Sequence, residues 1–196
     1  MMRRHELIRS TQSLGLSVWL DRPTADREAE FLVAVDESRA LHAPWVTPPT
    51  TAEGFRAYRR RAARRNVETF LVVERSSATM SGVITLSQIF YGPFCNAHCG
   101  FYGFRGQTGR GLMTAGLHLV LREAFDRLAL HRVEANIQPG NLPSRALVAR
   151  VGFLCEGYSP SYLWVDGAWR DHERWAIRPE CWRPPWAIGQ EGESVS

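Results

Sequence analysis

The spacing of hydrophobic and polar residues changes several times along the chain, and each change predicts a new element. Residues 16–20 ("LSVWL") alternate weakly, which predicts a first strand. Residues 23–42 carry apolar side chains at helical intervals, among them Phe31 and Val35. Three prolines in residues 43–51 ("APWVTPPTT") then predict a loop.

A helix and a hairpin are expected after this loop. Thr50 or Thr51 can cap the helix, which carries the basic run of residues 58–65. Residues 69–75 and 81–90 have strand character and are joined by a short polar turn. This arrangement is typical of an antiparallel hairpin.

The next three elements form a strand–helix–strand unit. Residues 96–104 predict a strand, and the glycine-containing turn at 107–114 leads into a long helix. That helix has one continuous apolar stripe, as expected for a helix packed on a sheet. Residues 131–137 predict the strand that follows.

The last part of the chain predicts a short helix and a hairpin. Asn141 is a suitable N-cap for the helix, and Gly152 suits its C-terminal end. Residues 161–177 form two aromatic-rich strands around Asp166 and Gly167, a pair typical of a two-residue hairpin turn.

The resulting order, β-α-α-β-β-β-α-β-α-β-β, has antiparallel hairpins on both sides of one crossover. It predicts an α+β fold, with a mixed, mostly antiparallel sheet and helices on both faces. A chain of 196 residues is expected to form one domain, 1–196. Its core would span about 16–179, followed by a tail, 180–196, whose last residues ("GQEGESVS") are expected to fray.

Composition narrows the functional classes. All 24 basic residues are arginines, which excludes a lysine Schiff base and the lysine of a P-loop. The formal net charge of +4 favours anionic ligands. No apolar run approaches the roughly 20 residues of a membrane span, and residues 1–21 lack a signal-peptide core. We therefore expect a cytoplasmic protein without a membrane partner.

The four cysteines do not predict a metal site. Cys95 and Cys99 are four residues apart, and no second Cys or His pair follows at the spacing of a zinc site. Cys155 and Cys181 stand alone. We expect separate thiols, no disulfide and no metal.

The turn "QTGRGLM" (107–113) suggests a phosphate-binding backbone. The missing lysine excludes a P-loop. A dinucleotide fingerprint would place a third glycine at Thr114, and the flanking hairpins disfavour it. Two interpretations remain open from the residues alone: a pyrophosphate cradle at a helix N-terminus, or an ordinary helix start with spare glycines.

Four blocks together resemble a known family. "TGRGLM" after "CGFYGF" resembles motif A of the GNAT N-acetyltransferase superfamily. "LHAPWV" (41–46), the block from His131 to Tyr158, and "YLWVDGAWRDH" (162–172) are similar to its RimJ/RimL branch, the ribosomal-protein N-terminal alanine acetyltransferases, and most of all to the RimJ group. The chain departs from motif A at Thr108, where Gln or Arg is usual, and at Met113, where Gly or Ala is usual.

The resemblance implies acetyl-CoA as a co-substrate and no metal. It assigns contacts with the pantetheine, the pyrophosphate and the reacting end to Phe101, Tyr102, Gly103, Thr108, Gly109, Arg110, Gly111, Leu112, Met113, Thr114, Asn141 and Ser144. Arg110 and Arg145 either reach the outer phosphates or remain solvated surface residues.

The resemblance also implies catalytic roles. Ser144 would be the general acid that protonates the departing thiolate, with Tyr158 or water as alternatives. Many members of the superfamily use a tyrosine as this acid. The matching position here is Val148, so that tyrosine is absent. The general base stays open, with Glu134 and Asp171 as candidates. Transfer would be direct, in a ternary complex, since no cysteine lies in a recognised nucleophile context.

The implied activity is acetyl transfer to a primary amine, foremost the N-terminal α-amino group of a ribosomal or similar protein. An acetyltransferase for a small amine, such as an antibiotic or a polyamine, and a non-catalytic acetyl-CoA-binding regulator are alternatives. One basic cluster is either a solvated face or a contact with ribosomal RNA or an acidic surface. It consists of Arg59, Arg60, Arg61, Arg64 and Arg65.

Overall fold

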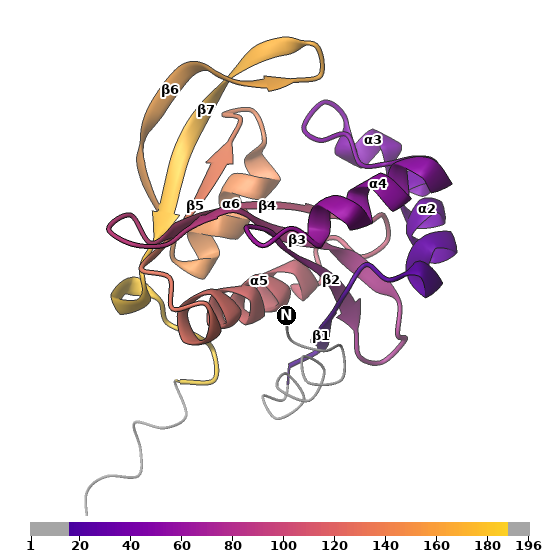
Figure 1. Cartoon of the computed structure of the whole chain (residues 1–196), viewed down its shortest axis with the longest axis horizontal. Coiled ribbons are helices and arrows are strands. Elements are labelled where there is room, and N and C mark those ends of the chain that lie inside the picture. The colour runs from indigo at the N-terminus through magenta and orange to yellow at the C-terminus, as the bar shows by residue number, and fades with distance from the viewer. Residues whose placement is uncertain (1–15, 188–196) are drawn as a thin grey trace, which may run out of the picture.

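The computed structural model describes residues 16–187, which form a twisted sheet with helices on both faces (Figure 1). The strands are β1 (Val18–Asp21), β2 (Glu68–Glu74), β3 (Met80–Phe90), β4 (Asn96–Gly103), β5 (Arg132–Ile137), β6 (Leu154–Val165) and β7 (Ala168–Ile177). The helices are η1 (Ala25–Arg27), α2 (Glu28–Glu37), α3 (Arg39–His42), α4 (Ala52–Ala62), α5 (Leu112–Arg122), η2 (Glu123–Arg127), α6 (Leu142–Val151) and η3 (Pro179–Cys181).

The described strands form a 7-stranded sheet in the order β1-β2-β3-β4-β5-β7-β6. Strands β4 and β5 pair in parallel, because α5 carries the chain across between them. The other neighbouring strands are antiparallel. The predicted fold class, a mixed and mostly antiparallel sheet with helices on both faces, is confirmed.

Two apolar cores lie on opposite faces of the sheet. Helices α5 and α6 cover one face, where Leu117 and Val148 are fully buried against strand residues such as Phe70. Helices α2 and α4 cover the other face through Phe31 and Phe55, whose ring centroids are 4.8 Å apart. Alternate residues of β2 enter opposite cores, since successive strand side chains point to opposite faces.

The parallel pair separates soon after it begins. Strand β4 pairs with β5 over Asn96–His98 and Arg132–Glu134. Strand β4 then continues to Gly103 along β3, while β5 pairs with β7 along its other edge from Val133 to Ile137. The backbone edge of β4 beyond His98 therefore faces a gap in the sheet.

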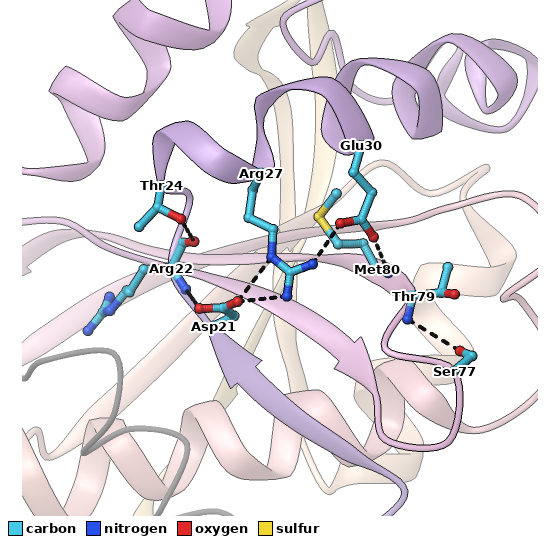
Figure 2. Close-up of polar contacts among 8 residues, drawn as sticks. All are labelled: Asp21, Arg22, Thr24, Arg27, Glu30, Ser77, Thr79 and Met80. Atoms are coloured by element: carbon cyan, nitrogen blue, oxygen red, sulfur yellow. Dashed lines mark hydrogen bonds and ion pairs between the residues drawn. The ribbon is translucent and has the colours of Figure 1, made fainter.

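A buried carboxylate joins the first strand to the first helices (Figure 2). Asp21, which is fully buried, accepts hydrogen bonds from Nε and Nη2 of Arg27 at 3.1 and 2.9 Å. Arg27 also donates to Glu30, and Glu30 accepts the backbone N–H of Met80 at 3.0 Å. These contacts fix η1 and α2 to β1 and to the start of β3.

The boundaries differ from the sequence-based expectation in two places. The helix predicted over 23–42 is divided, because Ser38 leaves the helical conformation and its hydroxyl bonds back to Ala34 O at 2.6 Å. Strand β6 starts at Leu154, seven residues before the predicted hairpin. Its exposed, irregular first half lacks the alternation that reveals a strand.

The predicted turns and caps are confirmed at several positions. Asp166 and Gly167 both have positive φ, of 48° and 74°, as a type I′ hairpin turn requires. Thr51 caps α4 by accepting from Gly54 N at 3.1 Å, and Asn141 caps α6. The fraying expected for residues 189–196 and the amino-terminal stretch 1–15 lie outside the described residues.

Within residues 16–187, no helix is long and apolar enough to cross a bilayer.

Candidate functional site

A pocket of about 800 Å³ opens at the gap between β4 and β5. Its walls come from the segment around α3, the end of β4, the glycine turn, the end of β5, α6 and one residue of β7. The crossover topology brings these segments together, because α5 starts at one side of the gap and α6 at the other. This position at a strand-order break is a usual one for a ligand site in sheet proteins.

The glycine turn forms one wall as an open backbone cradle. Gly109 and Gly111 have φ of 75° and 74°, a conformation that side chains rarely adopt, and no other atom lies within 4 Å of where a Cβ would stand. Gly111 is the N-cap of α5, so the N–H groups of the first helical turn have no intrahelical acceptor. The turn therefore offers several N–H donors and the positive end of a helix dipole to an anion.

Met113 occupies the motif position where glycine or alanine is usual, and Gly82 makes room for it. A Cβ on Gly82 would lie 2.4 Å from the Met113 sulfur. The larger side chain is thus accommodated by a missing side chain on β3. The larger residue at position 113 is thus matched by a glycine on the neighbouring strand, which the motif alone does not reveal.

The end of β4 forms a second wall. Phe101, Tyr102 and Gly103 pair with β3 along one edge, and their other edge faces the gap. Burial raises the pKa of Tyr102 well above its ordinary value, so its hydroxyl stays protonated. The ring of His42 lies against this segment and donates from Nε2 to Gly103 O at 2.9 Å.

Helix α6 forms the opposite wall. Asn141 Oδ1 accepts the N–H of Ser144 at 3.2 Å, and both residues line the pocket. Val148, at the position where many members of the superfamily carry a tyrosine, is fully buried in the core. The structure thus brings together the predicted residues of β4, the glycine turn and α6.

Several predicted residues point elsewhere. Arg110 does not line the pocket; it pairs with Glu74 and with Gln107 Oε1, the latter at 2.7 Å. Arg145 donates to Glu173 at 2.9 Å. Tyr158 lies outside the pocket on the β6–β7 hairpin.

The two candidate bases also lie outside the pocket lining. Glu134 pairs with Arg132 at 2.7 Å. The carboxylate of Asp171 accepts the Tyr158 hydroxyl, a contact that lowers the pKa of Asp171. Each of these two carboxylates is thus paired with a neighbouring side chain outside the pocket.

Three histidines that the sequence did not single out line the pocket: His42, His118 and His172. Burial lowers the pKa of His42 and of His118, so both rings are neutral near pH 7. His42 and His172 lie within the blocks "LHAPWV" and "WRDH", so the sequence marked their segments without indicating a role.

Cys99, which is buried, is the one cysteine among the described residues that line the pocket. Burial raises its pKa to about 12, which keeps the sulfur protonated and unreactive at neutral pH. Among the described residues, no group of three or more His, Cys, Asp or Glu side chains could hold a metal ion.

These features fit an elongated thioester cofactor that carries phosphates. An exposed strand edge suits amide groups, and a left-handed glycine turn at a helix N-terminus suits a pyrophosphate. A mixed sheet opened between two parallel strands, with this cradle beside the opening, defines the class of acyl-CoA N-acyltransferases.

The acetyltransferase (GNAT) domain model matches residues 18–154, and the chain belongs to this family. A probable N-acetyltransferase of Bacillus subtilis, YjcK, is 33% identical over 131 residues, which is 65% of this chain and 72% of that protein. The [ribosomal protein uS5]-alanine N-acetyltransferase of Escherichia coli is 37% identical over 103 residues. That alignment covers 53% of this chain and 53% of the relative, about half of each.

Solved structures agree with this placement. Mycobacterium smegmatis RimJ, in complex with a CoA-disulfide, has a TM-score of 0.71 and 31% identity and covers 83% of this chain and 82% of that one. The chain is therefore an acetyl-CoA-dependent N-acetyltransferase of the RimJ/RimL type. Acetyl-CoA supplies the activated acetyl group as co-substrate.

Proposed function

We propose that the protein acetylates the N-terminal α-amino group of a ribosomal or similar protein, as one N-acetyltransferase domain that works in the cytoplasm. The observation that carries the proposal is the 37% identity with the uS5-alanine acetyltransferase of E. coli. Leu41, Trp45 and Val46, from the segment around α3, line the pocket and would face the acceptor.

The pocket residues divide naturally between the parts of the cofactor. The free edge of β4 from Phe101 to Gly103 would hydrogen-bond the pantetheine amides, as an added strand would. The turn from Thr108 to Thr114 would hold the pyrophosphate. Asn141 would contact the cofactor from α6 while it caps that helix.

Ser144 is our candidate general acid. It is half-buried, lines the pocket from the first turn of α6, and has its N–H fixed by Asn141. A hydroxyl held here can give its proton to the departing thiolate. The protonated thiol of Cys99 argues against a covalent acetyl-cysteine step, which supports direct transfer.

Release of CoA thiol tests the substrate class. The purified chain is assayed with peptides of varied first residue, including Ala and Ser, and with a panel of aminoglycosides and polyamines. We expect turnover on Ala- or Ser-initiated peptides. Turnover confined to the small amines would contradict the proposal, and acetyl-CoA binding without thiol release would indicate a regulator instead.

We also propose that the basic end of α4 contacts the ribosome. Arg60, Arg64 and Arg65 are exposed at or beyond the C-terminus of the helix, while Arg59 is held by Pro23 O at 3.0 Å. Exposed arginines grouped at the end of a helix can pair with RNA phosphates.

Charge reversal tests this contact. We expect Arg64→Glu/Arg65→Glu to lower ribosome affinity and to reduce the salt slope by about two, since each phosphate contact contributes about one. The matched control is Arg39→Glu/Arg183→Glu, two exposed arginines elsewhere on the surface. Equal affinity and salt dependence for both variants would exclude an RNA contact.

A further inference from the structure

The pocket contains no carboxylate among its described lining residues. A base must nevertheless take a proton from the amine, because α-amino groups have a pKa near 8 and are mostly protonated at neutral pH. The titratable lining side chains are His42, Cys99, Tyr102, His118, Arg150 and His172. Arg150 and the protonated Cys99 and Tyr102 have no lone pair suited to this task, which leaves the histidines.

Two of the three histidines have no available lone pair. His118 Nδ1 accepts from Trp182 Nε1 at 3.0 Å, so its proton resides on Nε2. His42 donates from Nε2 to Gly103, and its Nδ1, although without a hydrogen-bond partner, is enclosed by protein atoms. An amine in the pocket can reach neither acceptor.

His172 differs because its Nε2 is neither engaged in a hydrogen bond nor among the enclosed, unpartnered side-chain atoms of the described residues. The residue is 3% exposed overall and lines the pocket. Nδ1 lies 2.9 Å from Arg170 O, and a carbonyl only accepts, so the proton resides on Nδ1. Nε2 then carries a lone pair that faces no hydrogen-bond partner among the described residues. The backbone contact thus selects the tautomer that a general base needs.

The direction of β7 places this ring opposite the candidate acid. Glu173 contacts Arg145 of α6, so its side chain lies on the α6 face of the sheet. Successive strand side chains alternate, which puts His172 on the other face. Ser144 is therefore on the α6 side of the pocket and His172 on the far side.

We propose that His172 is the general base of the reaction. This inference rests on the proposed amine acetylation, but not on which amine is acetylated. The protonated amine first gives one proton to Nε2 of His172, which passes it to solvent. The neutral nitrogen then forms a bond to the acetyl carbon and loses its second proton to Nε2. The carbon–sulfur bond breaks, and the thiolate is protonated by Ser144 or water. His172 releases this second proton to solvent, and Ser144, where it was the donor, is reprotonated from solvent. The net products are CoA thiol, the amide and one proton.

Charged residues flank His172 on β7. Asp171 precedes it, and its carboxylate is engaged by the Tyr158 hydroxyl and the Ser161 N–H. The ring of Tyr162 on β6 has its centroid 6.1 Å away. Arg170 and Arg174 lie two positions away from His172 on the same strand. The other titratable residues that line the pocket are His42, Cys99, Tyr102, His118 and Arg150.

Substitution by asparagine separates the base from the structural contact. His172→Asn retains an N–H near the position of Nδ1, which can still donate to Arg170 O, and lacks Nε2. His172→Gln, which lacks a titrating nitrogen, is the second variant in case the first folds poorly. His131→Asn, at an exposed histidine outside the pocket, is the matched control. The assay uses the best acceptor from the peptide and amine panels.

We expect kcat of His172→Asn to fall by about a hundredfold or more, with the dissociation constant of acetyl-CoA unchanged. The acid limb of the kcat profile should move to higher pH than in the wild type, because without the base only an amine that is already neutral can react. Added imidazole should restore part of the rate. A kcat within about threefold of wild type would overturn the inference. So would a loss that imidazole does not restore and that leaves the acid limb in place, since this indicates a structural role. Turnover on small amines alone would contradict only the substrate proposal.

Discussion

Arg110 projects from the glycine turn and pairs with Glu74 at the end of β2. Its guanidinium also donates to Gln107 within the turn at 2.7 Å. The Ser77 hydroxyl and the Arg110 guanidinium lower the pKa of Glu74, so the carboxylate stays charged. In this arrangement Arg110 positions the turn against the sheet, and the backbone N–H groups are left to hold the phosphates.

Glu74→Gln separates this role from direct phosphate binding. If Arg110 positions the turn, the dissociation constant of CoA should rise, by no more than about fivefold because the pair is partly exposed. Pantetheine, which lacks the pyrophosphate, should bind equally well to both proteins. Isothermal titration with the two ligands measures this difference.

The opposite result has a definite meaning. Tighter CoA binding by Glu74→Gln would show that the released Arg110 is itself a phosphate ligand, which contradicts the positioning role. Glu37→Gln, an exposed carboxylate on α2, is a control for the change in net charge.

At the scale of elements, the contact of α5 with the sheet depends on a missing side chain. Gly116 lies in the middle of α5 and is buried against Val72 of β2. A Cβ at Gly116 would stand 2.6 and 2.8 Å from the two methyl carbons of Val72. Glycine costs the helix about 1 kcal/mol relative to alanine, so close packing must outweigh this preference.

We expect Gly116→Ala to destabilise the protein by about 1–2 kcal/mol, because overpacking exceeds the gain in helix propensity. Urea denaturation measures the free energy of unfolding. In a double-mutant cycle with Val72→Ala, the alanine at 116 should cost less, with a coupling of about 0.5 kcal/mol or more. Additive effects of the two changes would contradict the packing explanation.

Most elements could be predicted from the sequence because their signals are local. The cap at Thr51, the cap at Asn141 and the Asp166–Gly167 turn each rest on a few neighbouring residues, and the structure confirms all three. The first half of β6 was missed, because an exposed strand has no hydrophobic alternation. Local patterns reveal elements only where one face is buried.

The candidate site was less accessible to sequence reasoning. The glycine turn was recognisable, since left-handed glycines before a helix form a short motif. The histidines were not, because their roles depend on contacts between distant segments. His42 bonds to Gly103, 61 positions away, and His172 enters the pocket from β7, the last strand in the sequence.

At the scale of the whole molecule, the segment after β7 completes the face covered by α5. Trp182 packs against His118 and Phe125, and its indole N–H donates to His118 Nδ1 at 3.0 Å. Trp186 contacts both aromatic partners of this hydrogen bond. Ordered packing thus continues beyond residue 179, the expected end of the core.

This contact predicts how stability depends on pH. Burial lowers the pKa of His118 in the folded protein below the unfolded value of 6.5, and His42 is shifted in the same direction. The unfolded chain therefore binds protons first as the pH falls. The stabilising contribution is complete above about pH 6.5 and is lost as the pH falls toward the folded pKa values.

We expect the melting temperature of the wild-type protein to fall between pH 7.5 and pH 5.5, a range above the titration of most carboxylates. His118→Asn should have a smaller fall, because one of the two shifted histidines is gone. Trp182→Phe should also reduce it, since the lost N–H donor no longer opposes protonation of His118 Nδ1. The exposed His131→Asn is the control and should keep the wild-type slope. An unchanged slope in His118→Asn would show that this contact does not couple folding to pH.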